Sequence, residues 1–110
     1  MYGVPQVPSV NVSDLSPGVF LVDIREDDEW SEGRAPGALH VPLQTLPERL
    51  SELPADAPVY LICRSGSRSA YAAAWLGQQG IEAFNVDGGM LEWAAAGRPM
   101  EGDTDTPVVR

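Results

Sequence analysis

The sequence contains one residue equipped for covalent chemistry, its single cysteine, Cys63. Two of its seven basic residues, Arg64 and Arg68, lie within five positions of that cysteine, and all seven are arginine. A lone cysteine is most often a small buried hydrophobic residue. Guanidinium groups beside a thiol, however, favour the thiolate, which is the nucleophilic form. An acidic chain that gathers arginines around its only thiol therefore makes Cys63 a candidate nucleophile.

The residues around Cys63 follow the order strand, cysteine, small-residue loop, helix. Residues 59–62 form an apolar run typical of a buried strand, and residues 67–79 form an alanine-rich helical segment. Between them, Gly66 permits the backbone angles that turn several loop N–H groups toward one point. The N-terminus of the helix adds a field that favours an anion. This order predicts an anion-holding loop at the carboxyl end of a strand, where ligands of open α/β sheets bind.

The rest of the chain alternates between strand and helix patterns. Strands are expected at residues 19–24, 38–41 and 81–86, and helices near residues 26–30, 42–53 and 90–96. This alternation predicts an α/β fold, a single domain with a central, mostly parallel sheet flanked by helices. We expect that domain to span residues 1–100. Residues 101–110, which carry three acids, are expected to form a flexible acidic tail.

Composition excludes several classes of function. The net charge of −9 argues against nucleic-acid binding, which requires a basic face. No apolar run approaches the roughly 18 residues of a membrane span. The first residues have neither the basic region nor the apolar core of a secretory signal, so we expect a cytoplasmic protein. One cysteine and one histidine predict no metal cluster, and the acids at 26–29 are interpreted as a favourable helix start.

The segment 63–69, CRSGSRS, resembles the active-site loop of single-domain rhodaneses, the thiosulfate sulfurtransferases. Further segments match that family's motifs in the same order: LVDIRE at 21–26, GRAPGALHVP at 33–42, and VDGG at 86–89 followed by Trp93. Each of these outer motifs is weak alone, whereas the ordered set is specific. Together the matches cover roughly residues 10–100. The resemblance implies a rhodanese-like domain.

The resemblance also implies a reaction and a set of site residues. In that family a cysteine thiolate takes a sulfane sulfur from an anionic donor such as thiosulfate, and the persulfide passes it to a thiol or cyanide. Cys63 matches the catalytic cysteine, Arg25 an arginine that helps to bind the donor, and Asp23 an acid that gives structural support. The implied substrate-binding loop consists of Arg64, Ser65, Gly66, Ser67, Arg68 and Ser69. No metal or organic cofactor is implied, and a protein could serve as sulfur donor or acceptor.

Two other functions are compatible with this loop. The first is a non-catalytic sulfur relay or adaptor, which would use the same chemistry at Cys63. The second is a cysteine-dependent phosphatase or arsenate reductase, whose families place one more residue between cysteine and arginine than the four found here. Arg68 could either contact the substrate or order the loop. Ser65 stands where the two-domain thiosulfate enzymes have lysine, so one cation for the donor is absent.

Overall fold

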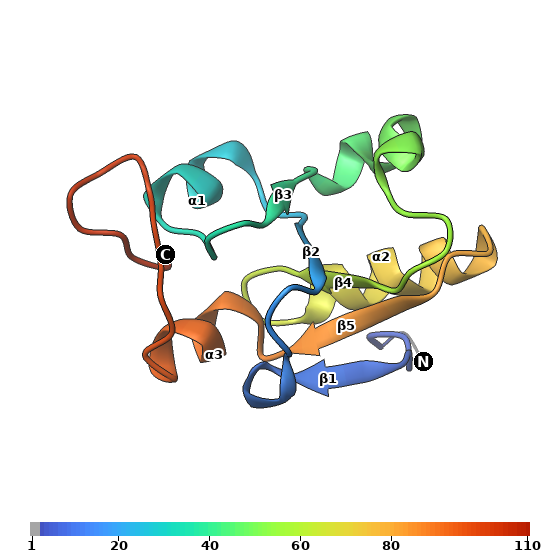
Figure 1. Ribbon diagram of the computed structural model, residues 1–110, viewed down its shortest axis with the longest axis horizontal. Helices are drawn as coiled ribbons and strands as arrows, with labels where there is room; N and C mark the ends of the chain where they lie inside the picture. The colour runs from blue at the N-terminus through green and yellow to red at the C-terminus, as the bar shows by residue number, and fades with distance from the viewer. Residues whose placement is uncertain (1–2) are drawn as a thin grey trace.

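A computed structural model of the chain describes residues 3–110. It contains one five-stranded sheet in the order β1-β5-β4-β2-β3, and every neighbouring pair is parallel (Figure 1). The strands are β1 (Ser9–Asn11), β2 (Phe20–Asp23), β3 (Leu39–His40), β4 (Val59–Ile62) and β5 (Ala83–Asp87). The predicted α/β fold with a parallel central sheet is confirmed. The first two residues of the domain expected at 1–100 lie outside the described residues.

The helices are short except for the one that follows the cysteine. They are η1 (Val12–Asp14), α1 (Asp27–Glu32), η2 (Leu43–Glu52), α2 (Ser67–Gln78) and α3 (Gly89–Ala95). The helix expected at 42–53 is a 3₁₀ segment that contains Pro47 and is kinked at Arg49. Pro47 has no backbone N–H to donate to the preceding turn, which disfavours a continuous α-helix through this segment. None of the helices in residues 3–110 is long and apolar enough to cross a membrane.

The sheet is buried on both faces, and this is why its central strands are continuous apolar runs. Val22 of β2 and Leu61 of β4 belong to the hydrophobic cluster that includes α2 and η2. Their chain neighbours Leu21 and Ile62 belong to the cluster on the other face, together with η1 and α3. Successive side chains of a strand point to opposite faces, so this division fixes the register. It also places Cys63 at the end of a strand enclosed on both sides.

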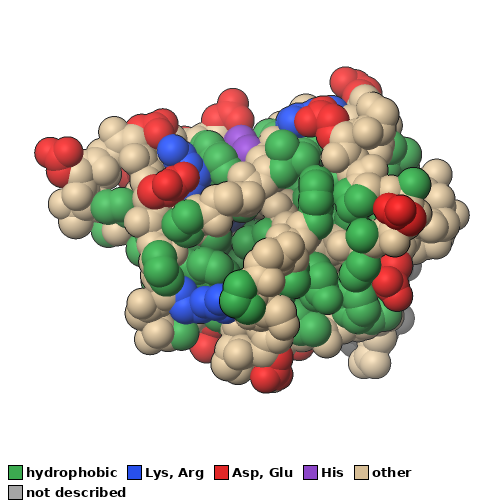
Figure 2. All heavy atoms as spheres, in the orientation of Figure 1, with side chains coloured by type: hydrophobic (Ala, Val, Ile, Leu, Met, Phe, Trp, Pro, Cys, Tyr) green, Lys and Arg blue, Asp and Glu red, His purple; other side chains and the backbone are tan. Residues whose placement is uncertain are grey.

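Residues 101–110 follow α1 along one end of the molecule (Figure 1). The backbone N–H of Asp103 donates to the carbonyl of Ser31 at 2.8 Å, and that of Val108 donates to Glu32 at 2.9 Å. The sequence predicts flexibility here, and that expectation stays a prediction. On the face seen in Figure 2, Asp and Glu side chains are dispersed around the rim and hydrophobic side chains lie over the middle.

Candidate active site

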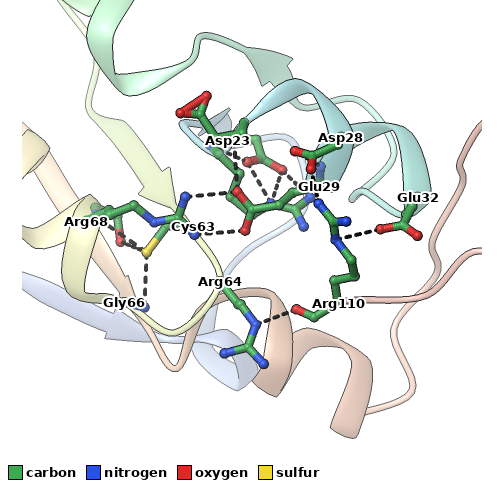
Figure 3. Close-up of polar contacts among 12 residues, drawn as sticks. Asp23, Asp28, Glu29, Glu32, Cys63, Arg64, Gly66, Arg68 and Arg110 are labelled. Atoms are coloured by element: carbon green, nitrogen blue, oxygen red, sulfur yellow. Dashed lines mark hydrogen bonds and ion pairs between the residues drawn. The ribbon is translucent and has the colours of Figure 1, made fainter.

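Cys63 lies fully buried at the point where β4 ends, with three polar groups around its sulfur. The backbone N–H of Gly66 donates to Sγ at 3.1 Å, and that of Ser69 does so at 3.4 Å. The Ser69 hydroxyl oxygen is 3.2 Å from the same sulfur. Figure 3 shows the Gly66 contact beneath the sulfur. The structure thus brings Gly66 and Ser69 of the predicted loop directly onto Cys63, where they can stabilise a negative charge.

The loop holds this shape through two glycines that lie far apart in the sequence. Gly66 has a φ of 106°, a conformation that favours glycine, and α2 begins immediately after it. At Gly89 a Cβ atom would lie 2.4 Å from the carbonyl oxygen of Cys63, so only glycine allows α3 to approach. The first N–H groups of α3 then donate to the carbonyls of Cys63 and Arg64, at 2.8 Å and 3.0 Å. With its carbonyls held by α3, the loop turns N–H groups toward the sulfur.

Asn85 of β5 supports the cradle, by which we mean the 63–69 loop whose Gly66 and Ser69 donors face the Cys63 sulfur. The Asn85 side chain is almost completely buried. Its Oδ1 lies 2.5 Å from the Ser69 hydroxyl, and its Nδ2 donates to the Gly66 carbonyl at 3.1 Å. The same Nδ2 group donates to Asp87 at 3.2 Å. Sequence reasoning missed this residue. The available signal was an amide inside an apolar strand, because a buried polar side chain needs hydrogen-bond partners.

Arg68 turns its guanidinium to Glu29 of α1, on the outer side of the site (Figure 3). Both contacts of this bidentate pair are 2.9 Å long. The hydrogen bonds from Arg68 hold the pKa of Glu29 at about 2, below its ordinary value of 4.5. The pair joins α2, the helix that follows Cys63, to α1, and the role of Arg68 toward a substrate stays a prediction. Glu29 was interpreted only as one of four acids at a helix start, and nothing in the sequence set it apart.

Asp23 and Arg25 form a buried ion pair at the end of β2, with side-chain exposures of 0% and 1%. The Arg25 guanidinium donates to both Asp23 carboxylate oxygens and to the carbonyl of Gly33 at 2.7 Å. Within residues 3–110, Arg25 makes no hydrogen bond to the 63–69 loop. The geometry therefore gives both residues a structural task, the connection of β2 to the end of α1. A direct role of Arg25 in donor binding stays a prediction.

The remaining loop residues, Arg64, Ser65 and Ser67, are exposed and form the outer rim of the site. The Arg64 Nε group donates to the backbone oxygen of Arg110, which in turn pairs with Asp28 and Glu32 of α1 (Figure 3). Residues 101–110 therefore reach the rim of the site. The rim is polar and exposed, whereas Cys63 beneath it is fully buried.

A comparison with protein families identifies the fold. The family model of the rhodanese-like domain matches residues 11–96 of this chain. The chain belongs to the rhodanese-like family. The predicted membership is thus confirmed, and the matched residues include β4, α2, β5 and α3.

Relatives in this family include named sulfurtransferases. A protein of Allochromatium vinosum named sulfurtransferase is 46% identical over 83 residues, which are 74% of this chain and 78% of that protein. A Bacillus subtilis protein whose name describes a candidate sulfur carrier is 36% identical over 81 residues, 73% of this chain but only 44% of its own length. The structure of a rhodanese-related protein from Thermoplasma volcanium is similar with a TM-score of 0.81 and 31% identity, covering 86% and 98% of the two chains. At the level of the family, these relatives support rhodanese-type sulfur transfer.

Proposed function

We propose that the protein is a sulfurtransferase that carries a sulfane sulfur as a persulfide of Cys63. The observation that carries the proposal is the set of donors around Sγ: two backbone N–H groups and one hydroxyl within 3.4 Å of the sulfur. Donors that are already in place stabilise an anion without reorganisation of the site. A cysteine that served only in packing would have no need of them.

The reaction follows from the position of the nucleophile. The Cys63 thiolate attacks the outer sulfur of a donor such as thiosulfate; the donor's S–S bond breaks, and its electron pair leaves on sulfite. The new persulfide anion is held by the N–H groups of Gly66 and Ser69. A thiol or cyanide then attacks the outer sulfur and releases the Cys63 thiolate. Because Cys63 is the only cysteine in the chain, no second thiol of this chain can resolve the persulfide as a disulfide.

A sulfur relay between proteins is the second candidate, and one observation favours it. Cys63 has no exposed surface, so a donor or acceptor reaches its sulfur only after neighbouring residues move, and the docking of a partner protein is one way to move them. The relative whose name describes a candidate sulfur carrier is consistent with such a role. Phosphatase or arsenate reductase chemistry is less well supported, because Arg68 is bound to Glu29 rather than turned into the loop as an oxyanion ligand.

Steady-state assays separate these functions. We expect turnover of thiosulfate with cyanide, release of sulfite and thiocyanate in equal amounts, and no hydrolysis of an aryl phosphate. The Cys63→Ser variant is the control, because a hydroxyl is a far weaker nucleophile at neutral pH. Sulfur uptake without turnover would favour the relay, and phosphate release that depends on Cys63 would overturn the proposal.

A further inference from the structure

The hydroxyl group of Ser69 lies between two acceptors but has one hydrogen to donate. Its oxygen is 3.2 Å from Cys63 Sγ and 2.5 Å from Asn85 Oδ1. Only one of these contacts can receive the hydroxyl hydrogen at a given moment. The position of that hydrogen decides whether Ser69 presents a donor or a lone pair to the reacting sulfur.

The orientation of the Asn85 amide is fixed by its other neighbours. Its Nδ2 group faces the Gly66 carbonyl at 3.1 Å and the Asp87 carboxylate at 3.2 Å, and both of these groups can only accept. A flipped amide would place an oxygen against two acceptors, so Oδ1 faces Ser69. That oxygen is itself an acceptor, and therefore Asn85 competes with Cys63 for the hydrogen of Ser69.

The charge on the sulfur decides the competition. A neutral thiol is a weak acceptor, so the hydrogen of Ser69 goes to the amide oxygen of Asn85 while the thiol donates its own hydrogen to Ser69. A sulfur anion is a much better acceptor, because a hydrogen bond to a charged group is about twice as strong as a neutral one. The hydroxyl then rotates, and its hydrogen moves from Asn85 to the sulfur.

We propose that Asn85 is a positioning residue that holds the Ser69 hydrogen while Cys63 is a neutral thiol and yields it when the sulfur becomes an anion. It acts through Ser69 and does not touch the reacting atom. The inference rests on the proposed function only in taking the Cys63 anion as the reacting form. Of the three donors around the sulfur, the Ser69 hydroxyl is then the one that becomes available only when the sulfur carries a negative charge.

The charged groups around Cys63 set the background for this effect. They lie on several elements and are Arg68 on α2, Glu29 on α1, Asp23 and Arg25 at the end of β2, Asp87 on β5, and Arg64 in the loop. None of them is altered in the variants below. A change in the titration of Cys63 therefore reports on Asn85 and Ser69.

The test follows the ultraviolet absorbance of the Cys63 thiolate as a function of pH, with Cys63→Ser protein as the blank. The Asn85→Leu substitution removes the competing acceptor at similar volume. We expect the midpoint of the titration to fall by about 0.5–1 pH unit, the effect of one hydrogen bond. In Asn85→Asp, which keeps an acceptor and adds a charge, the midpoint should rise. If the Asn85→Leu variant does not fold, the titration of the Asn85→Asp variant still tests the proposal.

The decisive comparison repeats both substitutions in a Ser69→Ala background. If Asn85 acts through the Ser69 hydroxyl, the Asn85→Leu/Ser69→Ala double variant should have the same Cys63 titration midpoint as Ser69→Ala alone. In the same background, the rise of the midpoint caused by Asn85→Asp should shrink to the part due to the added charge. The Phe84→Leu variant is a control for weakening of β5, because Phe84 stacks on Tyr60 and not on the site. An unchanged or raised midpoint in Asn85→Leu, or a shift that persists without Ser69, would overturn the proposal. Absorbance reports ionisation without sulfur transfer, so this inference and the proposed function fail separately.

Discussion

Two ion pairs of the same chemical type, the inner pair Asp23–Arg25 and the outer pair Glu29–Arg68, lie at different depths near the end of α1. The side chains of the inner pair are at most 1% exposed. In the outer pair, Glu29 binds Arg68 through two contacts of 2.9 Å, yet the Arg68 side chain is 35% exposed. The first pair connects a strand to a helix inside the protein, and the second connects two helices at the surface.

The difference in depth predicts different losses of stability when the two pairs are broken. A buried ion pair that loses one partner leaves an uncompensated charge in the interior, whereas exposed pairs contribute little. The inner pair therefore holds the end of β2 to Gly33 at the end of α1, and losing one partner is costly. The outer pair is partly solvated, and the exposed residues Arg64 and Ser65 lie at the rim of the site.

The largest effect on stability should come from the inner pair. The Asp23→Asn variant leaves the Arg25 guanidinium buried without its counter-charge, and we expect a loss of about 3–5 kcal/mol in the free energy of unfolding. Urea denaturation at pH 7 measures this loss. The Asp103→Asn variant is the matched control, because Asp103 makes the same kind of ion pair with Arg34 at the surface. Equal losses in the two variants would contradict the distinction between buried and exposed pairs.

A smaller effect is expected at the outer pair. The Glu29→Gln variant breaks the pair with Arg68, and since that arginine is partly solvated we expect a loss of about 1 kcal/mol at pH 7. Sulfur loading of Cys63 should remain, because the donors to its sulfur are held by Asn85 and by α3 rather than by Glu29. Urea denaturation and intact mass measure the two quantities. A variant that is stable but takes up no sulfur would show that the outer pair is part of the cradle.

The same variant has a pH signature whose sign is fixed by the depressed pKa of Glu29. The folded-state pKa is about 2 and the ordinary value is 4.5, so the pair stabilises the fold above pH 4.5. That contribution is lost as the pH falls from about 4.5 toward 2. The stability difference between wild type and Glu29→Gln should therefore narrow between pH 6 and pH 3. A difference that stays constant over this range would contradict the pairing.

The smallest effect on stability is expected at the rim. The Ser65→Lys variant changes an exposed residue, so the free energy of unfolding should stay within about 0.5 kcal/mol of the wild type. The added cation should lower the KM for thiosulfate at low ionic strength, and salt should remove the gain by screening. Ser65→Gln is the neutral control of similar length. A gain that is indifferent to salt would show that charge at this position does not limit donor binding.

What could be predicted from the sequence was the part of the site that is local in the chain. A strand, a cysteine, a glycine-containing loop and a helix follow one another within residues 59–79, so their order alone predicted an anion cradle at Cys63. The residues that were missed contact the loop from a distance. Asn85 is 16 residues from Ser69, and Glu29 is 39 residues from Arg68. Pairings of this kind depend on how strands and helices pack, and periodicity carries no information about them.

For Arg25, the role in donor binding implied by the resemblance stays a prediction, and the sequence did not show how deeply its side chain is buried. Its depth was decided by the neighbouring Asp23 and by the carbonyl of Gly33, which together use its Nε and Nη2 groups. Short elements were also hard to predict. The strand β1 has only three residues, too few for their alternation to predict a strand, and it pairs with β5.

The central claim is that Cys63 alone carries sulfur, and intact-mass measurement tests it most directly. After incubation with thiosulfate, or with a small-molecule persulfide, the wild-type protein should gain the mass of one sulfur atom, and cyanide should remove it. The Cys63→Ser variant should fold normally and gain nothing, since no other thiol is present. A wild-type protein that takes up no sulfur from either donor, or a serine variant that takes it up, would contradict the account.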